Sequence, residues 1–214
     1  MFACAAQPNV NRMPPKPDRR TEKSRKALLG AFVAILLEEG YAAVTVERVA
    51  ARADVGRSTF YTHFTGKEDI LRQAMARPSS VLAVIVGHDL APEAIVPQLL
   101  HFHAQRRRNG IVFADPVRAI WAGCLADLIE PRLAAVARQA RARPILPLAV
   151  IARQIAEAQL ALIAGWLGGR AAAKPEAVAE ALIATTRALT AALLRAAPTA
   201  PLFIAGEKLR IVQA

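Results

Sequence analysis

The chain has 214 residues, of which 54% are hydrophobic, and it carries a formal net charge of +11. This length suits one compact domain or a small domain joined to a larger one. Two cysteines, Cys4 and Cys124, exclude a disulfide framework or a cysteine-rich metal site and favour a reducing, cytoplasmic setting. The charge favours a polyanionic partner, nucleic acid or an acidic membrane surface, although an arginine-rich composition alone gives the same charge.

The N-terminal residues 1–17 contain four prolines and no apolar periodicity, which predicts a disordered leader. Basic residues begin within it and continue through Arg19–Lys26, forming either an arm along DNA or a solvated tail. We expect no signal peptide, because a basic start and an apolar core are both missing. We also expect no membrane-spanning helix at 145–167, since Arg153 and Glu157 interrupt the ~20 apolar residues required.

Four helices are predicted in the first part of the chain. The first carries apolar residues at helical spacing and ends at Gly40. Thr45 is predicted to cap a second helix over 46–53, and a tight turn leads to a short third helix over 57–63. A fourth begins at Lys67. Two short helices joined by a tight turn are typical of a helix-turn-helix.

The later part of the chain shows longer helical patterns separated by prolines. We predict helices near 92–108, 116–141, 147–167 and 175–196, with the second split near Pro131. Residues 198–214 receive no assignment. Because alanine and leucine are abundant and β-branched runs are short, the predicted fold is all-α.

The third predicted helix has two chemically different faces. Phe60 and Phe64 lie four residues apart and are predicted to anchor it to the core. The opposite face is polar, with Tyr61 at its edge, which suits entry into a DNA major groove. Arg57 and Ser58 lead the helix and are the candidates for reading base edges, since arginine on guanine is the commonest specific contact.

The segment from Thr45 to Leu71 closely resembles the DNA-binding signature of the TetR (tetracycline-repressor-like) family. The resemblance rests on Thr45, the Val49–Ala50 pair, Val55, the run Thr59–Phe64, and Lys67-Glu68 before Leu71, preceded by Gly40-Tyr41. Two positions depart from the family pattern. Asp54 stands where glycine is usual, and Gly56 where serine is frequent. Both are compatible with the turn, because aspartate tolerates the left-handed conformation and glycine is an acceptable N-cap.

This resemblance implies a domain division and a set of DNA-contacting residues. A helix-turn-helix domain would occupy 18–66, and a helical effector-binding and dimerisation domain would occupy 67–197. Lys67 would contact phosphate beside a helix N-terminus. The expected DNA-binding residues are Thr45, Arg57, Ser58, Thr59, Tyr61, Thr62, His63 and Lys67.

The resemblance also implies a homodimer on a palindromic operator, with half-sites about 34–36 Å apart. Apolar stripes on the last two helices favour a four-helix dimer interface, the alternative being an ordinary monomeric core. The interface residues expected are Ile151, Ile155, Leu162, Trp166, Leu182, Leu189 and Leu193. An unidentified small-molecule effector is expected in the second domain. Its candidate lining, each residue equally compatible with plain core, is Phe102, His103, Phe113, Trp121, Cys124, Leu125, Leu128 and Gln159.

These features bear on three possible functions. An effector-controlled repressor is the leading interpretation, and an architectural protein binding DNA without base readout is the second. An enzyme is disfavoured, because the sequence has no nucleophile motif, glycine-rich phosphate loop or paired carboxylates. Metal-ligand spacing is also missing, so we expect no cofactor and no metal.

Overall fold

The computed structural model describes residues 19–106, 110–169 and 172–195. Within these ranges the chain forms helices and loops without a β-strand, which confirms the predicted all-α fold. The predicted leader and the unassigned tail lie outside the described residues.

The first three helices form a small unit, which we call the head. It consists of α1 (Arg19–Glu39), α2 (Val46–Arg52) and α3 (Arg57–His63), with a 3-10 turn, η1, at Tyr41–Ala43. The helix α1 ends where predicted, because Gly40 adopts a φ of 88° that favours glycine. Its buried stripe of Leu28, Phe32, Ile35 and Leu36 packs against apolar side chains of α2 and α3.

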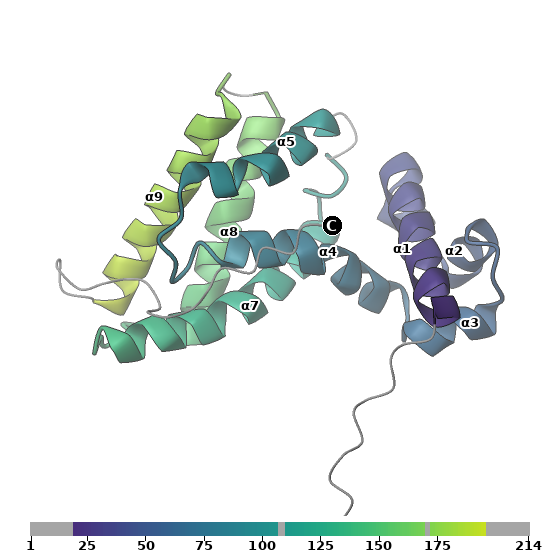
Figure 1. Ribbon diagram of the computed structural model, residues 1–214, viewed down its shortest axis with the longest axis horizontal. Helices are drawn as coiled ribbons and strands as arrows, with labels where there is room; N and C mark the ends of the chain where they lie inside the picture. The colour runs from purple at the N-terminus through teal and green to yellow at the C-terminus, as the bar shows by residue number, and fades with distance from the viewer. Residues whose placement is uncertain (1–18, 107–109, 170–171, 196–214) are drawn as a thin grey trace, which may run out of the picture.

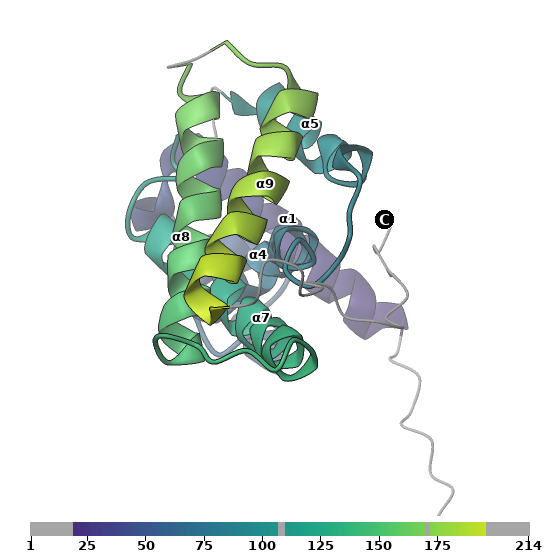
Figure 2. The same ribbon diagram turned by 90° about the vertical axis from the view of Figure 1, so that its left-hand side faces the viewer.

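The helix α4 (Lys67–Ala83) leaves the head and runs into a larger unit, the body (Figure 1). The body contains the 3-10 turn η2 (Pro92–Ala94) and the helices α5 (Val96–Ala104), α7 (Val117–Gln139), α8 (Leu148–Leu167) and α9 (Pro175–Leu194). Packing of α7 on both α8 and α4 forms its centre. Figure 2, which looks at the end of the body away from the head, has α8 and α9 side by side in front.

Two predicted boundaries are wrong in the body. The predicted split near Pro131 is absent, since α7 is continuous from Val117 to Gln139 with the proline inside it. Proline removes one helical hydrogen bond at a cost of about 3 kcal/mol, but Ile129 and Leu133 on either side are fully buried and hold the helix in place. The predicted helix at 92–108 is instead η2 followed by α5, which ends at Ala104.

Helices α8 and α9 are each 20 residues long and apolar enough, by length and mean hydropathy, to cross a membrane. The sequence analysis excluded such a span for the first of them. Only 39% of each apolar window is buried in the chain. Each helix therefore has a large apolar area that this chain alone does not cover.

Candidate nucleic-acid interface

The turn between α2 and α3 is fixed by local backbone chemistry. The Thr45 hydroxyl accepts a hydrogen bond of 3.2 Å from the Arg48 amide and caps α2, as predicted. Asp54 adopts a φ of 54°, so the turn does require the left-handed conformation that aspartate was expected to tolerate. The Val55 amide then donates to the Ala50 carbonyl at 3.0 Å, closing the turn before Gly56. These bonds set the angle at which α3 leaves α2.

Two phenylalanines anchor α3 to the head. Phe60 and Phe64 are buried, with ring centroids 5.4 Å apart, which confirms their predicted core role. The Tyr61 ring meets Phe60 edge-on yet keeps 53% of its surface exposed. Because one face of α3 is held by aromatic packing, its other face, with Arg57, Ser58 and Thr62, points outward.

Two predicted DNA contacts of α3 make hydrogen bonds within the chain, and a third is half-buried. The His63 Nε2 lies 2.8 Å from the Ser24 hydroxyl of α1, which joins the end of α3 to the first helix. The Thr62 hydroxyl donates to the Ser58 carbonyl at 3.0 Å within α3. Thr59 is half-buried. These side chains thus contribute to the position of α3, while Arg57, Ser58 and Tyr61 are its most accessible members.

Lys67 does not extend into solvent from the start of α4. Its Nζ donates to the carbonyls of Tyr41 and Val44 at 3.3 and 3.4 Å and lies 4.3 Å from the Tyr41 ring centroid. The pKa of the Tyr41 hydroxyl is raised, mainly by burial and also by the nearby charge of Glu68. Contact with a phosphate would require the Lys67 side chain to leave these carbonyls or reach past them.

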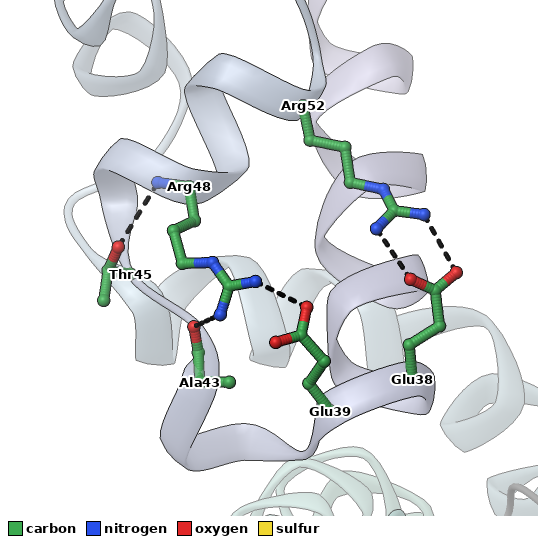
Figure 3. Close-up of polar contacts among 6 residues, drawn as sticks. All are labelled: Glu38, Glu39, Ala43, Thr45, Arg48 and Arg52. Atoms are coloured by element: carbon green, nitrogen blue, oxygen red, sulfur yellow. Dashed lines mark hydrogen bonds and ion pairs between the residues drawn. The ribbon is translucent and has the colours of Figure 1, made fainter.

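Two arginines of α2 turn toward α1 and link the helices of the head (Figure 3). Arg48 donates to Glu39 and to the Ala43 carbonyl, while Arg52 makes a two-bond pair with Glu38 at 2.7 and 2.9 Å. The Glu38 carboxylate raises the pKa of the Arg52 guanidinium. These pairs were not predictable from the sequence, because spacings of nine and fourteen residues give no indication of contact.

The third arginine of the helix-turn-helix, Arg57, has its own carboxylate partner. Its Nη2 lies 3.0 Å from Oε1 of Glu47, in the first turn of α2, and both side chains remain more than half exposed. The backbone N–H of Glu47 itself, together with the Arg57 charge, lowers the pKa of the Glu47 carboxyl. The sequence analysis singled out Arg57 but not Glu47.

A chain of polar contacts joins α1 to the start of α4. Asp69 accepts from the Thr65 amide at 2.8 Å and from Gln73 at 3.1 Å, and Gln73 in turn accepts from Arg25 at 2.7 Å. The Thr65 backbone bond is the main cause that lowers the pKa of the Asp69 carboxyl. The contacts therefore tie α4 to the head on which the recognition helix sits.

Basic residues at the start of α1 extend this surface. Arg19, Arg20 and Lys23 are exposed. The Ser24–His63 bond places that end of α1 beside the end of α3, as Figure 1 shows. Cations next to the recognition helix suit attachment to a phosphate backbone.

The eight side chains predicted to line an effector pocket are not brought together. Phe102, Phe113 and Trp121 do form one aromatic cluster, with centroid distances of 5.1 to 6.2 Å. The other five lie elsewhere. His103 stacks on Trp166, Cys124 contacts Arg72, Leu125 is buried in the core, Leu128 is exposed, and Gln159 is buried and donates to Thr186.

A cavity of about 650 Å³ lies where the head meets the body, and we call it the junction cavity. Phe102 and Trp121 line it, but most of its wall comes from residues that the sequence analysis missed. They include Val33, Leu36 and Leu37 of α1, Met75, Arg77, Pro78 and Val81 of α4, and Gln98, His101 and Gln105 on α5 and just after it. The space is bounded jointly by α1, α4 and α5, which are far apart along the chain, so only the tertiary structure reveals it.

Four of the seven predicted interface residues are buried inside the single chain. Ile151, Ile155 and Leu182 are fully buried and Trp166 is 9% exposed, so their apolar stripes belong to the body's own core. Leu162, Leu189 and Leu193 are half-buried at its margin.

In the described part of the chain, no three His, Cys, Asp or Glu side chains gather where they could hold a metal ion.

The fold and this surface define a helix-turn-helix protein with a helical C-terminal domain. Residues 28–74 match the family described as bacterial regulatory proteins, tetR family. The chain is 31% identical over 163 residues to the HTH-type transcriptional repressor KstR of Mycobacterium tuberculosis, covering 70% of this chain and 73% of that one. It therefore belongs to the TetR family of transcriptional regulators.

Other similarities are shorter or structural. An HTH-type regulator of Bacillus subtilis, YxbF, is 35% identical over 72 residues, and one of Mycobacterium bovis is 30% identical over 113 residues. The chain spans 18% and 50% of the lengths of these two relatives. A TetR regulator structure from Streptococcus agalactiae shares the fold with a TM-score of 0.50 and 24% identity, covering 79% of this chain and 96% of that one.

Proposed function

We propose that the protein is a repressor that binds a palindromic operator as a homodimer and is controlled by a small-molecule effector. The observation that carries this proposal is the geometry of α3. Its apolar side is fixed by Phe60 and Phe64, while Arg57, Ser58 and Tyr61 stand on the exposed side. A short, rigidly held helix with polar side chains on its free face can reach base edges in the major groove.

Dimerisation through α8 and α9 is supported by the apolar area that the chain leaves exposed. Each helix has a line of exposed or half-exposed side chains at helical spacing, all small or apolar except Gln154. Above Gly165 an added methyl group would meet no atom within 4 Å. Small residues allow close helix approach, so two copies would form a four-helix bundle. The residues proposed for this face are Val150, Gln154, Ala158, Ala161 and Gly165 on α8, and Ala177, Ala181, Ala184, Ala188 and Ala192 on α9.

Covering of this face by lipid is the alternative that its hydropathy allows. We favour a second copy, because Glu157 and Arg153 lie within α8 itself and pair with each other, as Glu157 also does with Arg118, and charged groups are costly in lipid. Light scattering on the protein purified without detergent distinguishes the two. A monodisperse dimer is expected, whereas a protein that stays in solution only with detergent would contradict dimerisation through this face.

The junction cavity is the proposed effector site. Its volume of about 650 Å³ suits a small molecule, and its lining is mainly apolar, with a few polar groups such as Arg77, Glu93 and His101. Because Val33 and Leu36 of the head line it together with α4 and α5 of the rest of the chain, a bound molecule would touch both sides of the junction. A ligand with different affinity for two head positions would shift the balance between them and so change DNA binding.

Selection from a pool of randomised duplexes tests the proposed function. Purified protein should enrich a palindrome and bind it ~10³-fold or more tightly than scrambled duplex of the same composition. Tyr61→Ala should weaken this binding, while Leu100→Ala, an exposed site on α5 outside the junction cavity and the proposed dimer face, serves as the matched control. Equal affinity for every duplex would instead favour the second candidate, an architectural protein attached through its basic surface.

A further inference from the structure

The pairing of acids with arginines in the helix-turn-helix is not uniform. Arg48 and Arg52 both pair with carboxylates of α1, and so join α2 to the first helix (Figure 3). Arg57 differs from these two, because its partner is Glu47 of α2, at 3.0 Å. Two consecutive helices of the motif are thus joined by an ion pair at the point where the recognition helix begins.

The ion pair of Glu47 contributes little to folding, and its negative charge disfavours DNA binding. Exposed ion pairs contribute little to folding, because both charges are well solvated. Glu47 is 56% exposed and Arg57 is 61% exposed, so the pair falls in this class. A carboxylate beside a surface that meets phosphates also repels DNA. Its place in the first turn of α2 favours the helix N-terminus, and its contact with Arg57 gives it a second role at the start of α3.

We propose that Glu47 is a specificity-determining positioning residue, which holds the guanidinium of Arg57 in the orientation that reads a base. This inference rests on the proposed function, because it assumes that α3 enters the major groove. Arginine reads guanine through two parallel hydrogen bonds, and this requires a fixed plane for its guanidinium. The guanidinium has five N–H donors, and the observed contact with Glu47 uses the Nη2 side, leaving other donors for O6 and N7 of a guanine.

Without its carboxylate partner, Arg57 would sample many rotamers and could reach phosphates as well as bases. Its charge would then contribute to binding of every duplex instead of favouring one sequence. Loss of Glu47 should therefore change two quantities in opposite directions. Affinity for random DNA should rise, because a repulsive charge is removed, and discrimination at one base pair should fall.

The test compares Glu47→Gln, Arg57→Ala and the double variant on the duplex selected by the wild-type protein. Each half-site position is substituted in turn, and the dissociation constants give a mismatch penalty at every position. The wild-type protein should show a penalty of about 10- to 100-fold at the guanine read by Arg57. Glu47→Gln should reduce that penalty to a few-fold at this position only, and should raise affinity for scrambled duplex severalfold.

The double variant should discriminate no worse than Arg57→Ala alone, because Glu47 acts through Arg57. Glu38→Gln is the matched control, since it removes the same charge from the pair with Arg52, which does not involve α3. It should leave every mismatch penalty unchanged. Circular dichroism melting confirms that the variants fold, as expected for exposed side chains.

Three results would overturn the proposal. If Glu47→Gln raises affinity for all duplexes equally and keeps every mismatch penalty, Glu47 is only a repulsive surface charge. If Glu47→Gln lowers the mismatch penalties at positions that Arg57→Ala leaves unchanged, Glu47 does not act through Arg57. If the wild-type protein enriches no sequence at all, the proposed function itself fails, and this outcome is distinct because it appears before any variant is compared.

Discussion

The helices α2 and α3 of the head are shorter than α8 and α9 of the body, and fewer buried contacts hold them in place. In the head, α2 and α3 have seven residues each and depend on a few aromatic and aliphatic contacts with α1. In the body, α8 and α9 have 20 residues each, and both bury one face while leaving another exposed. Helices of seven residues are not stable alone, so the head exists only as a packed unit.

This difference indicates where each half is sensitive to substitution. A change in the head alters the position of α3, since few contacts fix it. A change on the outer face of α8 or α9 leaves the fold of one chain intact and alters only what that face binds. Stability, DNA binding and assembly can therefore be separated by substitutions in the two units.

Removal of a head anchor should have the largest effect. Phe60→Ala deletes a fully buried ring, and large-to-small changes of this kind cost about 3–5 kcal/mol. We expect urea unfolding monitored by circular dichroism to show this loss, together with loss of binding to the selected duplex. The dimer seen by light scattering should persist, because the body does not contain this residue. Loss of the dimer as well would contradict the separation of head and body.

A charge on the outer face of α9 should produce the opposite pattern. Ala184→Glu buries two uncompensated carboxylates in the proposed dimer and should weaken association about 100-fold, or roughly 2.7 kcal/mol. Sedimentation across a concentration series measures this change. Ala119→Glu, at an exposed alanine of α7, is the control and should leave the dimer intact. Unaltered association of Ala184→Glu would show that this face is not the interface.

Loss of the α2 cap should have a smaller effect, again confined to the head. Thr45→Ala removes the hydroxyl that accepts from the Arg48 amide, and substitution of such caps costs about 1 kcal/mol. Urea denaturation should detect it. Thr45→Ser, which retains the hydroxyl, should recover most of the loss. If serine and alanine behave alike, the hydrogen bond contributes nothing and the methyl group accounts for the effect.

The smallest expected effect is a dependence on pH at the start of α4. The Thr65 amide lowers the pKa of Asp69 in the folded chain, so the stabilisation is complete above the pKa of Asp69 in the unfolded chain. It is lost as the pH falls through the lowered folded value. The wild-type protein should therefore exceed Asp69→Asn in stability near pH 7, and the difference should shrink toward about pH 3. A constant difference would contradict the role of the ionised carboxylate.

How far the sequence could predict the structure also differs between the two units. The third helix begins and ends where predicted, because Phe60 and Phe64 at helical spacing and the glycine-containing turn before it are local signals. The continuity of α7 through Pro131 was not predictable in this way. It depends on how many buried side chains on both flanks contact other helices.

The candidate site shows the same division. The sequence identified Arg57, Ser58 and Tyr61 as accessible residues of the recognition helix, since their position on one face follows from helical periodicity. It did not identify Glu47 as the partner of Arg57, nor Ser24 as the partner of His63. Contacts between helices depend on crossing angles, and these are set by packing that spacing along the chain does not encode.

By itself, the sequence determined the all-α class, the helix-turn-helix and its family, because periodicity, caps and turn residues act over a few positions. The tertiary structure alone decided which apolar stripe of α8 and α9 faces inward. It also decided where a cavity opens between head and body. An apolar side chain is equally suited to a core or to a partner surface, and only the packing of the whole chain determines which it joins.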